Sequence, residues 1–383
     1  MRARGIVVAA MSGGVDSAVT AALLKREGWD VIGITLQIWQ ERADQGRDGG
    51  CCSLGAVEDA RRAASRIGIP HYVLNLRDHF GQEVIRRFIA EYSRGRTPNP
   101  CVECNRSVKF SELLRQARAL GADFLATGHY ARIRRNEETG RWELWRARDT
   151  RKDQSYALYT LTQDQLQRTL MPLGELESKA ETRRIAAELG LPVAAKPDSQ
   201  EICFVPPEGY TRLLRDQAPE ACRPGPVVDT SGRVRGRHEG IAHYTIGQRR
   251  RLPASGSGPL YVVALDPESN TVVVGAEEEL YAAAFEASGM NWIALADLPG
   301  SLAVWARIRY NGAASPALIE PGPDHGSVRC RFHEPQRAVT PGQAAVFYNG
   351  DRVIGGGTIE RVLAEEPQAR PRPAAGAVQA RAS

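Results

Sequence analysis

Apolar and polar stretches alternate along the first 130 residues as expected for a parallel sheet covered by helices. Short apolar runs predict buried strands at residues 6–11, 31–36, 71–76 and 124–127. Apolar residues at helical spacing predict helices at residues 18–27, 56–67, 80–92 and 108–120. Because strands and helices alternate, we expect an α/β fold whose ligands bind at the carboxyl ends of the strands.

The pattern changes after residue 130. Two alternating runs at 131–135 and 141–148 predict a hairpin, and helices are expected at 163–170 and 179–189. Later apolar runs are short and are separated by turn residues, which is typical of barrels and sandwiches. We therefore expect an α/β domain, a small β-rich module, a C-terminal β-barrel and a disordered Pro-, Ala- and Arg-rich tail, over residues 1–205, 206–280, 281–365 and 366–383.

A glycine turn at residues 12–17, with the sequence Ser-Gly-Gly-Val-Asp-Ser, joins the first predicted strand to the first helix. Glycines let the backbone approach an anion, and a helix N-terminus attracts a phosphate. Asp16 would repel a phosphate unless a cation lay between them, which predicts a Mg²⁺ contact. Two glycines alone would indicate only a tight connection. The two serines and the aspartate favour nucleotide binding.

This turn is neither the usual P-loop nor the dinucleotide fingerprint, because it lacks both of their patterns. It resembles instead the SGGxDS loop of the ATP pyrophosphatase (PP-loop) superfamily. That resemblance implies cleavage of ATP between the α- and β-phosphates and adenylation of a substrate oxygen. It does not specify the substrate.

Composition adds modest constraints. The chain has 383 residues, a net charge of +5 and a pI of about 8.9, which permits a nucleic-acid partner without requiring one. No apolar run reaches the length of a membrane span, and the first strand begins almost at the N-terminus. We therefore expect a cytoplasmic protein. In such a compartment, clustered cysteines indicate metal or redox chemistry rather than structural disulfides.

Seven cysteines are present, and two of them share a C-x-x-C spacing at Cys101 and Cys104. Pro98 and Pro100 predict a loop that exposes these thiols to a metal or to redox chemistry. No second C-x-x-C exists, so a closed zinc site is weakly supported. Cys203 lies alone, 99 residues further on. Cys222 and Cys330 fit buried positions, and the pair at 51–52 fits either a mobile loop or a second thiol site.

Several motifs together resemble the bacterial tRNA-specific 2-thiouridylases of the MnmA type. In the first half they are residues 11–17, 95–100, 104–105 with 109–110, 126–130, 152–156 and 202–204. In the second half they are residues 247–249, 309–310, 340–343 and 345–350. The resemblance covers nearly the whole chain except the tail. It implies that ATP adenylates the C2 oxygen of the wobble uridine and that sulfur then replaces this oxygen.

The resemblance also implies roles for individual residues. ATP would be held by Ala10, Met11, Ser12, Gly13, Gly14, Val15, Asp16, Ser17, Leu36 and Gly128. The target base would face Asn99, Pro100 and Cys101, and tRNA would meet His129, Lys152, Asp153, Gln154, Arg309, Tyr310 and Gln343. Cys203 would carry a persulfide received from a sulfur-donor protein, and Cys104 would be the second catalytic thiol.

Position 101 departs from the family pattern, because many relatives carry aspartate where this chain has Cys101. Cys101, Cys104 and Cys203 together would suit a [4Fe–4S] cluster with one open iron. A persulfide route needs only Cys104 and Cys203, and Cys101 would then be a spare thiol. Both routes stay open, as do two other functions: a PP-loop synthetase acting on a small molecule, and an RNA-binding protein without turnover.

Overall fold

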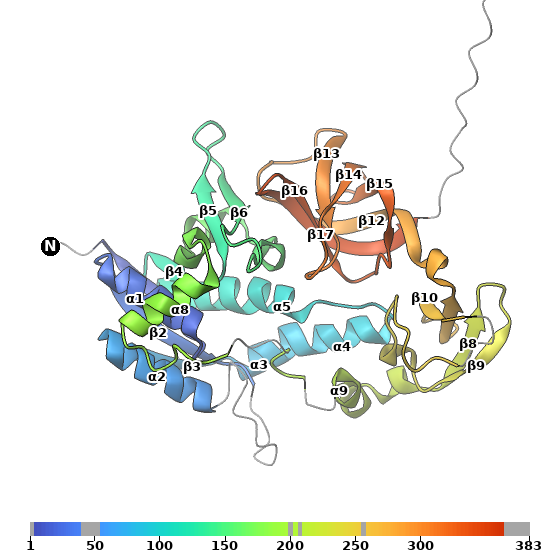
Figure 1. The fold of residues 1–383 in the computed structure, drawn as a ribbon, viewed down its shortest axis with the longest axis horizontal. Coiled ribbons are helices and arrows are strands. Elements are labelled where there is room, and N and C mark those ends of the chain that lie inside the picture. Colours follow the sequence, from blue (N-terminus) through green and yellow to red (C-terminus); the bar gives the residue numbers. More distant parts are fainter. Residues whose placement is uncertain (1–3, 40–53, 198–201, 206–208, 254–257, 364–383) are drawn as a thin grey trace, which may run out of the picture.

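The computed structural model describes residues 4–39, 54–197, 202–205, 209–253 and 258–363. The cysteines at 51 and 52 and the predicted tail at 366–383 lie outside these residues. Figure 1 shows an α/β layer at the N-terminal end, a β-barrel beside it and a smaller β-rich module at the far end. No helix in the described part of the chain is long and apolar enough to cross a membrane.

The first part is built on a five-stranded parallel sheet with the order β3-β2-β1-β4-β7. Its strands are β1 (Ile6–Ala10), β2 (Asp30–Gln37), β3 (His71–Asn75), β4 (Phe124–Ala126) and β7 (Thr169–Leu170). The central strand is apolar throughout because helices cover both faces of the sheet. Val7 and Ala9 pack into one apolar core and Val8 into another, as the two-residue period of a strand requires. The expected α/β fold is confirmed.

Helices on the two faces keep the sheet buried. One face carries α1 (Val15–Arg26), α2 (Leu54–Ile67) and α8 (Lys179–Glu188). The other face packs against a long interrupted helix made of α5 (Pro100–Glu103), a π-helical stretch (Cys104–Leu113) and α6 (Leu114–Ala119). A similar interrupted helix, made of α3 (Arg77–Phe80), a π-helical stretch (Gly81–Ile85) and α4 (Arg86–Ser93), lies beside it. The short helix α7 (Gln163–Gln167) precedes β7.

The prediction of a loop around the C-x-x-C spacing is wrong, because a helix begins there. Pro100 occupies the first helical position, where its missing N–H removes no helical hydrogen bond. Asn99 caps this helix: its side-chain oxygen accepts hydrogen bonds from the backbone N–H groups of Cys101 (3.1 Å) and Val102 (3.4 Å). The two thiols differ in exposure, although they lie only three residues apart. Cys101 is exposed and Cys104 is buried.

The middle module contains a four-stranded sheet with the order β10-β11-β8-β9. Its strands are β8 (Gly225–Asp229), β9 (Val234–His238), β10 (Tyr261–Asp266) and β11 (Thr271–Gly275). Helix α9 (Tyr210–Gln217) precedes the sheet, and its Leu213 and Leu214 share an apolar cluster with Phe80 and Phe88 of the first part. This packing connects the module to α3 and α4.

Six antiparallel strands close into the C-terminal barrel in the order β12-β15-β14-β13-β16-β17, and β12 pairs with β17. They are β12 (Tyr281–Trp292), β13 (Leu302–Arg307), β14 (Ser315–Pro321), β15 (Val328–Arg337), β16 (Ala344–Asn349) and β17 (Arg352–Leu363). Strand β17 also pairs with β6 (Trp142–Arg146) of the predicted hairpin, whose other strand is β5 (Ala131–Arg135). Leu144, Tyr156 and Tyr348 belong to one core. The barrel and the α/β domain are thus packed together.

Candidate active site

A cavity of about 640 Å³ opens at the carboxyl ends of β1, β2 and β4, where an α/β fold places its ligands. We call it the main cavity. Of the residues expected to hold ATP, all except Gly13 line it. It also contains Cys104 and five residues expected to meet tRNA, namely His129, Lys152, Asp153, Gln154 and Tyr310. Segments that are far apart in the sequence therefore converge on one space.

The phosphate loop, residues 12–17, is held by its own serines. Helix α1 begins at Val15, with Gly14 as its extended N-cap residue. The Ser17 hydroxyl donates to the carbonyl oxygen of Gly14 (3.1 Å) and accepts from the backbone N–H of Ser12 (3.1 Å). These bonds leave the start of α1 directed into the main cavity, which is a favourable place for a phosphate.

The two glycines of the loop have different structural roles. Gly13 has a φ of +70°, and a Cβ there would lie 2.2 Å from the carbonyl oxygen of Ala56 in α2. Gly14 has a φ of −99°, and a Cβ there would meet only the Ser12 hydroxyl at 3.5 Å. Gly13 is therefore required by the fold of the loop. At Gly14 only a bound ligand would need the space.

Asp16 already has cationic and hydroxyl partners. The Lys179 ammonium lies 2.5 Å and 2.7 Å from its two carboxylate oxygens, and the Tyr130 hydroxyl donates to one of them at 2.7 Å. A carboxylate held in this way has both oxygens occupied by an ammonium. Lys179 is thus the counter-ion of Asp16 in this structure, and the Mg²⁺ contact expected of Asp16 stays a prediction. The sequence interpretation missed Lys179. This residue begins α8, and nothing in the sequence places the start of α8 beside the phosphate loop.

Lys196 lies on the other side of the phosphate loop. Its ammonium donates to the carbonyl oxygen of Gly13 (3.1 Å) and to the carboxylate of Asp59 (2.7 Å). Burial raises the pKa of Asp59, but hydrogen bonds from Lys196 and Arg62 lower it, and the resulting pKa is below the usual value. The loop is thus flanked by two lysines, each held by an aspartate. Lys196 was not among the residues expected at the site; it opens a Lys-Pro-Asp-Ser-Gln run, the sequence signal that could have drawn attention to it.

The structure places the cysteines expected at the site in different surroundings. Cys104 lines the main cavity and belongs to an apolar cluster with Phe80, Phe88 and Phe204. Cys203 packs against the same cluster, whereas Cys101 is exposed and outside it. Among the described residues, no group of three His, Cys, Asp or Glu side chains is arranged to hold a metal ion. Cys104 and Cys203 thus share one apolar cluster, and the persulfide and [4Fe–4S] routes both stay predictions.

Several residues expected to meet tRNA have internal partners. Asp153 is buried and accepts from the backbone N–H groups of residues 147 and 155, and Gln154 accepts from the N–H of Tyr130. Arg309 donates to the carbonyl oxygen of Ala338 at 2.6 Å, and Gln343 donates to that of residue 97 at 2.7 Å. Asp153 and Gln154 line the main cavity, whereas Arg309 and Gln343 are not among its lining residues. Tyr310 is 38% exposed and has a free face toward solvent.

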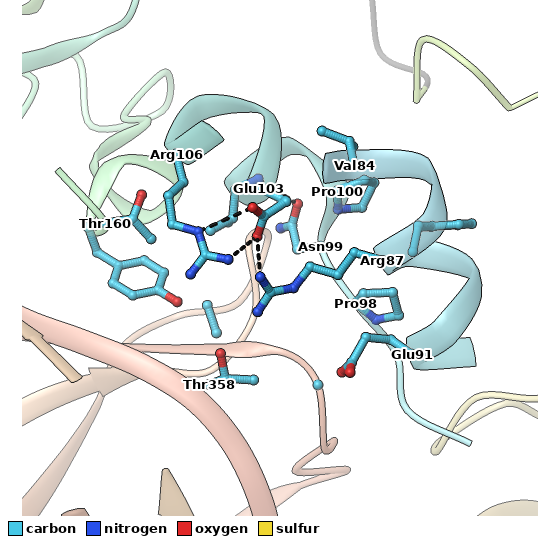
Figure 2. Close-up of a pocket in the computed structure, with 15 residues that line it drawn as sticks. Val84, Arg87, Glu91, Pro98, Asn99, Pro100, Glu103, Arg106, Thr160 and Thr358 are labelled. Carbon is cyan, nitrogen blue, oxygen red and sulfur yellow. Dashed lines mark hydrogen bonds and ion pairs between the residues drawn. The ribbon is translucent and has the colours of Figure 1, made fainter. Parts of the chain in front are cut away.

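A second, smaller pocket of about 60 Å³ lies beneath the helix that carries the cysteines (Figure 2). Asn99 and Pro100 line it from one side and Thr358 of the barrel from the other. Figure 2 shows the Glu103 carboxylate between two guanidinium groups, those of Arg106 (2.5 Å) and Arg87 (3.4 Å). The ion pair with Arg87 ties α5 to α4, so it helps to fix the helical segment that leads into Cys104.

His129 lies in the wall of the main cavity, with Nδ1 2.8 Å from the Thr127 hydroxyl and its ring 5.7 Å from that of Phe110. Burial, and secondly the nearby Lys109 ammonium, holds the pKa of His129 well below its usual value. His129 is therefore neutral at pH 7. It can accept or donate a hydrogen bond, but it cannot neutralise a phosphate.

A pH-dependent loss of stability follows from this shift. Below about pH 6.5 the unfolded chain binds a proton at position 129 that the folded chain does not. The free energy of unfolding therefore decreases as the pH is lowered. We expect this loss to be smaller in His129→Asn, by at most about 1.4 kcal/mol per pH unit. Denaturant unfolding of both proteins between pH 7.5 and 5 measures the difference. Equal slopes would show that His129 is not buried as a neutral group.

Comparison with known proteins agrees with this architecture. Residues 5–207 match the family described as the tRNA methyl transferase HUP domain, 212–276 the tRNA methyl transferase PRC-barrel domain and 282–359 the aminomethyltransferase beta-barrel domain. A 4-thiouridine synthetase solved with RNA and bound ATP resembles part of the fold, with a TM-score of 0.35 and 19% identity over 56% of this chain and 51% of that one. This structural likeness is too low to support an argument.

Likeness to curated proteins is much higher and spans nearly the whole chain. The tRNA-specific 2-thiouridylase MnmA of Heliobacterium modesticaldum is 55% identical over 93% of this chain and 93% of its own length. The protein of the same name from Moorella thermoacetica is 54% identical over 92% of this chain and 99% of its own length. On the strength of this identity and coverage, the chain belongs to the MnmA family of tRNA-specific 2-thiouridylases.

Proposed function

We propose that this protein uses ATP to replace the C2 oxygen of the wobble uridine of tRNA with sulfur. The observation that carries the proposal is the main cavity, which combines the phosphate loop with the Cys104 thiol. An adenylating enzyme needs the loop, and a sulfur transferase needs the thiol. Family membership supplies the tRNA substrate.

Two chemical steps follow from this combination. The C2 oxygen of the uridine attacks the α-phosphorus of ATP, the bond between the α- and β-phosphates breaks, and pyrophosphate leaves with the electron pair. The adenylated C2 carbon is then attacked by sulfur, and AMP leaves with the former C2 oxygen. Adenylation is needed because an unmodified oxygen is a very poor leaving group. We propose that residues 10–17, Leu36 and Gly128 hold ATP for the first step.

For the second step we propose a persulfide on Cys203, loaded by a sulfur-donor protein in the cytoplasm. Its terminal sulfur attacks C2 and displaces AMP. The Cys104 thiolate then attacks the inner sulfur of Cys203, which releases the thiolated base and leaves a Cys104–Cys203 disulfide for an external thiol to reduce. The shared apolar cluster of the two cysteines supports this route over a [4Fe–4S] cluster. Thiolate reactivity at Cys104 is required, because the thiol form does not attack.

Around these steps, we propose that the other residues named by the resemblance bind tRNA. Asn99, Pro100 and Cys101 would face the target base, and His129, Lys152 and Tyr310 would contact the anticodon region at the mouth of the main cavity. Asp153, Gln154, Arg309 and Gln343 would act mainly by holding these surfaces in place, since each has an internal hydrogen-bond partner.

The test combines two measurements on the full chain. Pyrophosphate release is followed with tRNA, with tRNA lacking a wobble uridine, and without RNA, while 2-thiouridine is measured by mass spectrometry in the presence of a persulfide donor. We expect both signals only with the first RNA, and we expect tRNA affinity to fall as salt rises. Pyrophosphate release that does not depend on tRNA would favour a small-molecule synthetase. Binding of tRNA without release would favour an RNA-binding protein.

A further inference from the structure

We infer that Lys179 and Lys196 form a two-lysine clamp that binds the β- and γ-phosphates of ATP and then the departing pyrophosphate. The inference rests on the proposed ATP-dependent reaction and deepens it by assigning two residues that the sequence motifs did not include. Both side chains line the main cavity beside the phosphate loop. Each of them contacts a residue of that loop or its backbone directly.

Lys179 is held on the inner side of the loop. Its side chain is 12% exposed, and its ammonium contacts both carboxylate oxygens of Asp16, the acidic residue at the start of α1. It is also the first residue of α8, which the Ser178 side chain caps by accepting from the backbone N–H of residue 181. Because α8 packs against α1, the ammonium is fixed next to the loop by helix packing.

Lys196 is held on the outer side of the loop by different partners. Its ammonium bridges the carbonyl oxygen of Gly13 and the carboxylate of Asp59 in α2. The side chain is 27% exposed, which leaves it accessible from the cavity. Its four-carbon stem lets the ammonium turn from the Gly13 carbonyl to a ligand without backbone movement.

The charge arrangement explains why both lysines are paired with aspartates. The start of α1 offers only a partial positive charge, roughly half an elementary charge, whereas ATP brings several negative charges. Two lysines without partners would repel each other and the helix end. Asp16 and Asp59 hold them in place until the phosphates arrive, and the ammonium groups then shift toward the phosphates.

This clamp would act mainly in the transition state. As the bond between the α- and β-phosphates breaks, the oxygen that stays on the β-phosphate gains an electron pair. An ammonium that hydrogen-bonds to this oxygen binds more strongly as the negative charge grows, which lowers the barrier. Among the other basic residues of the cavity, Lys109 contacts Asn105, Arg151 contacts Asp149, and Arg307 contacts Asp153 and the Tyr156 ring.

The experiment compares ligands that differ in their phosphates. Lys179→Gln and Lys196→Gln are titrated with AMP, ATP and pyrophosphate by calorimetry at fixed Mg²⁺, with Lys25→Gln at the exposed end of α1 as the matched control. We expect affinity for ATP and pyrophosphate to fall about 10- to 100-fold in each cavity variant, as for loss of a hydrogen bond to a charged group. Affinity for AMP should stay within about twofold, which also shows that the site is folded.

A further variant separates the lysine clamp from a metal site at Asp16. In Asp16→Asn the Lys179 ammonium loses its counter-ion, so the clamp predicts equal or tighter pyrophosphate binding. A Mg²⁺ site formed by Asp16 would predict weaker binding. Parallel loss of AMP and ATP affinity in Lys179→Gln, or weaker pyrophosphate binding in Asp16→Asn, would overturn the inference. Failure of the proposed function would appear instead in the wild-type protein, as pyrophosphate release that does not require tRNA.

Discussion

Loss of thiolation with adenylation retained is the expected result of replacing either Cys104 or Cys203 by serine. Both cysteines pack in one apolar cluster, and Cys104 reaches the main cavity. A serine hydroxyl neither carries a persulfide sulfur nor attacks one at neutral pH. We expect 2-thiouridine formation to fall more than about 1,000-fold, and tRNA-dependent pyrophosphate release in the first turnover to stay within roughly threefold of wild type.

Cys101→Ala is the matched control for these variants, because Cys101 lies one helical turn away and is exposed. We expect it to retain thiolation within roughly threefold, since its thiol takes no part in the persulfide route. Thiolation by all three variants should be measured with a persulfide donor, together with the iron content of anaerobically purified protein. Equal loss of activity and of iron in all three variants would contradict the persulfide route and establish a cluster held by Cys101, Cys104 and Cys203.

Gly13→Ala is expected to abolish ATP binding and to destabilise the fold at the same time. An alanine at a φ of +70° costs about 1–2 kcal/mol, and its Cβ would overlap the carbonyl oxygen of Ala56. The loop or the start of α2 must therefore move, which displaces the N–H groups that face the phosphate. We expect ATP affinity to fall at least about 100-fold and the melting temperature to fall by several degrees.

Gly14→Ala provides the contrast, because the protein itself has room for its Cβ. We expect an unchanged melting temperature and weaker ATP binding, since only the approaching phosphates need that space. Calorimetric titration with ATP and thermal unfolding of both variants test the pair. Unchanged ATP affinity in Gly14→Ala would show that the phosphates do not pass this side of the loop. A normal melting temperature in Gly13→Ala would contradict its role in the fold.

Much of the architecture could be predicted from sequence because its causes are local. Ile6–Ala10 is continuously apolar, as a strand covered on both faces must be, and the following glycines and serines define a phosphate loop by their own conformations and hydroxyls. The short runs separated by turn residues in the C-terminal half likewise indicated a barrel, and six strands close there. In each case neighbours in the sequence supply the interactions that decide the structure.

The sequence also predicted most of the segments that meet in the main cavity, because the carboxyl ends of strands in a parallel sheet lie at one edge. The phosphate loop follows β1, Gly128 follows β4 and Leu36 lies near the carboxyl end of β2; these strands are neighbours, and all three contribute to one site. The cysteine helix was missed because a proline is ambiguous. Pro100 either breaks a helix or begins one, and the Asn99 cap just before it marks Pro100 as the first helical residue.

Only the tertiary structure decided which charges face the phosphate loop. Lys179 and Lys196 lie more than 160 residues from Asp16 and Gly13, and α8 and the segment after it bring them back across the sheet. The same holds for the cysteines: spacing grouped Cys101 with Cys104, whereas Cys104 and Cys203 pack in one apolar cluster to which the exposed Cys101 does not belong. Local sequence determines the conformation of a loop through its own dihedral angles and hydrogen bonds. The counter-ions around the loop depend on long-range packing, because an ion pair requires only proximity in space, which spacing along the chain does not encode.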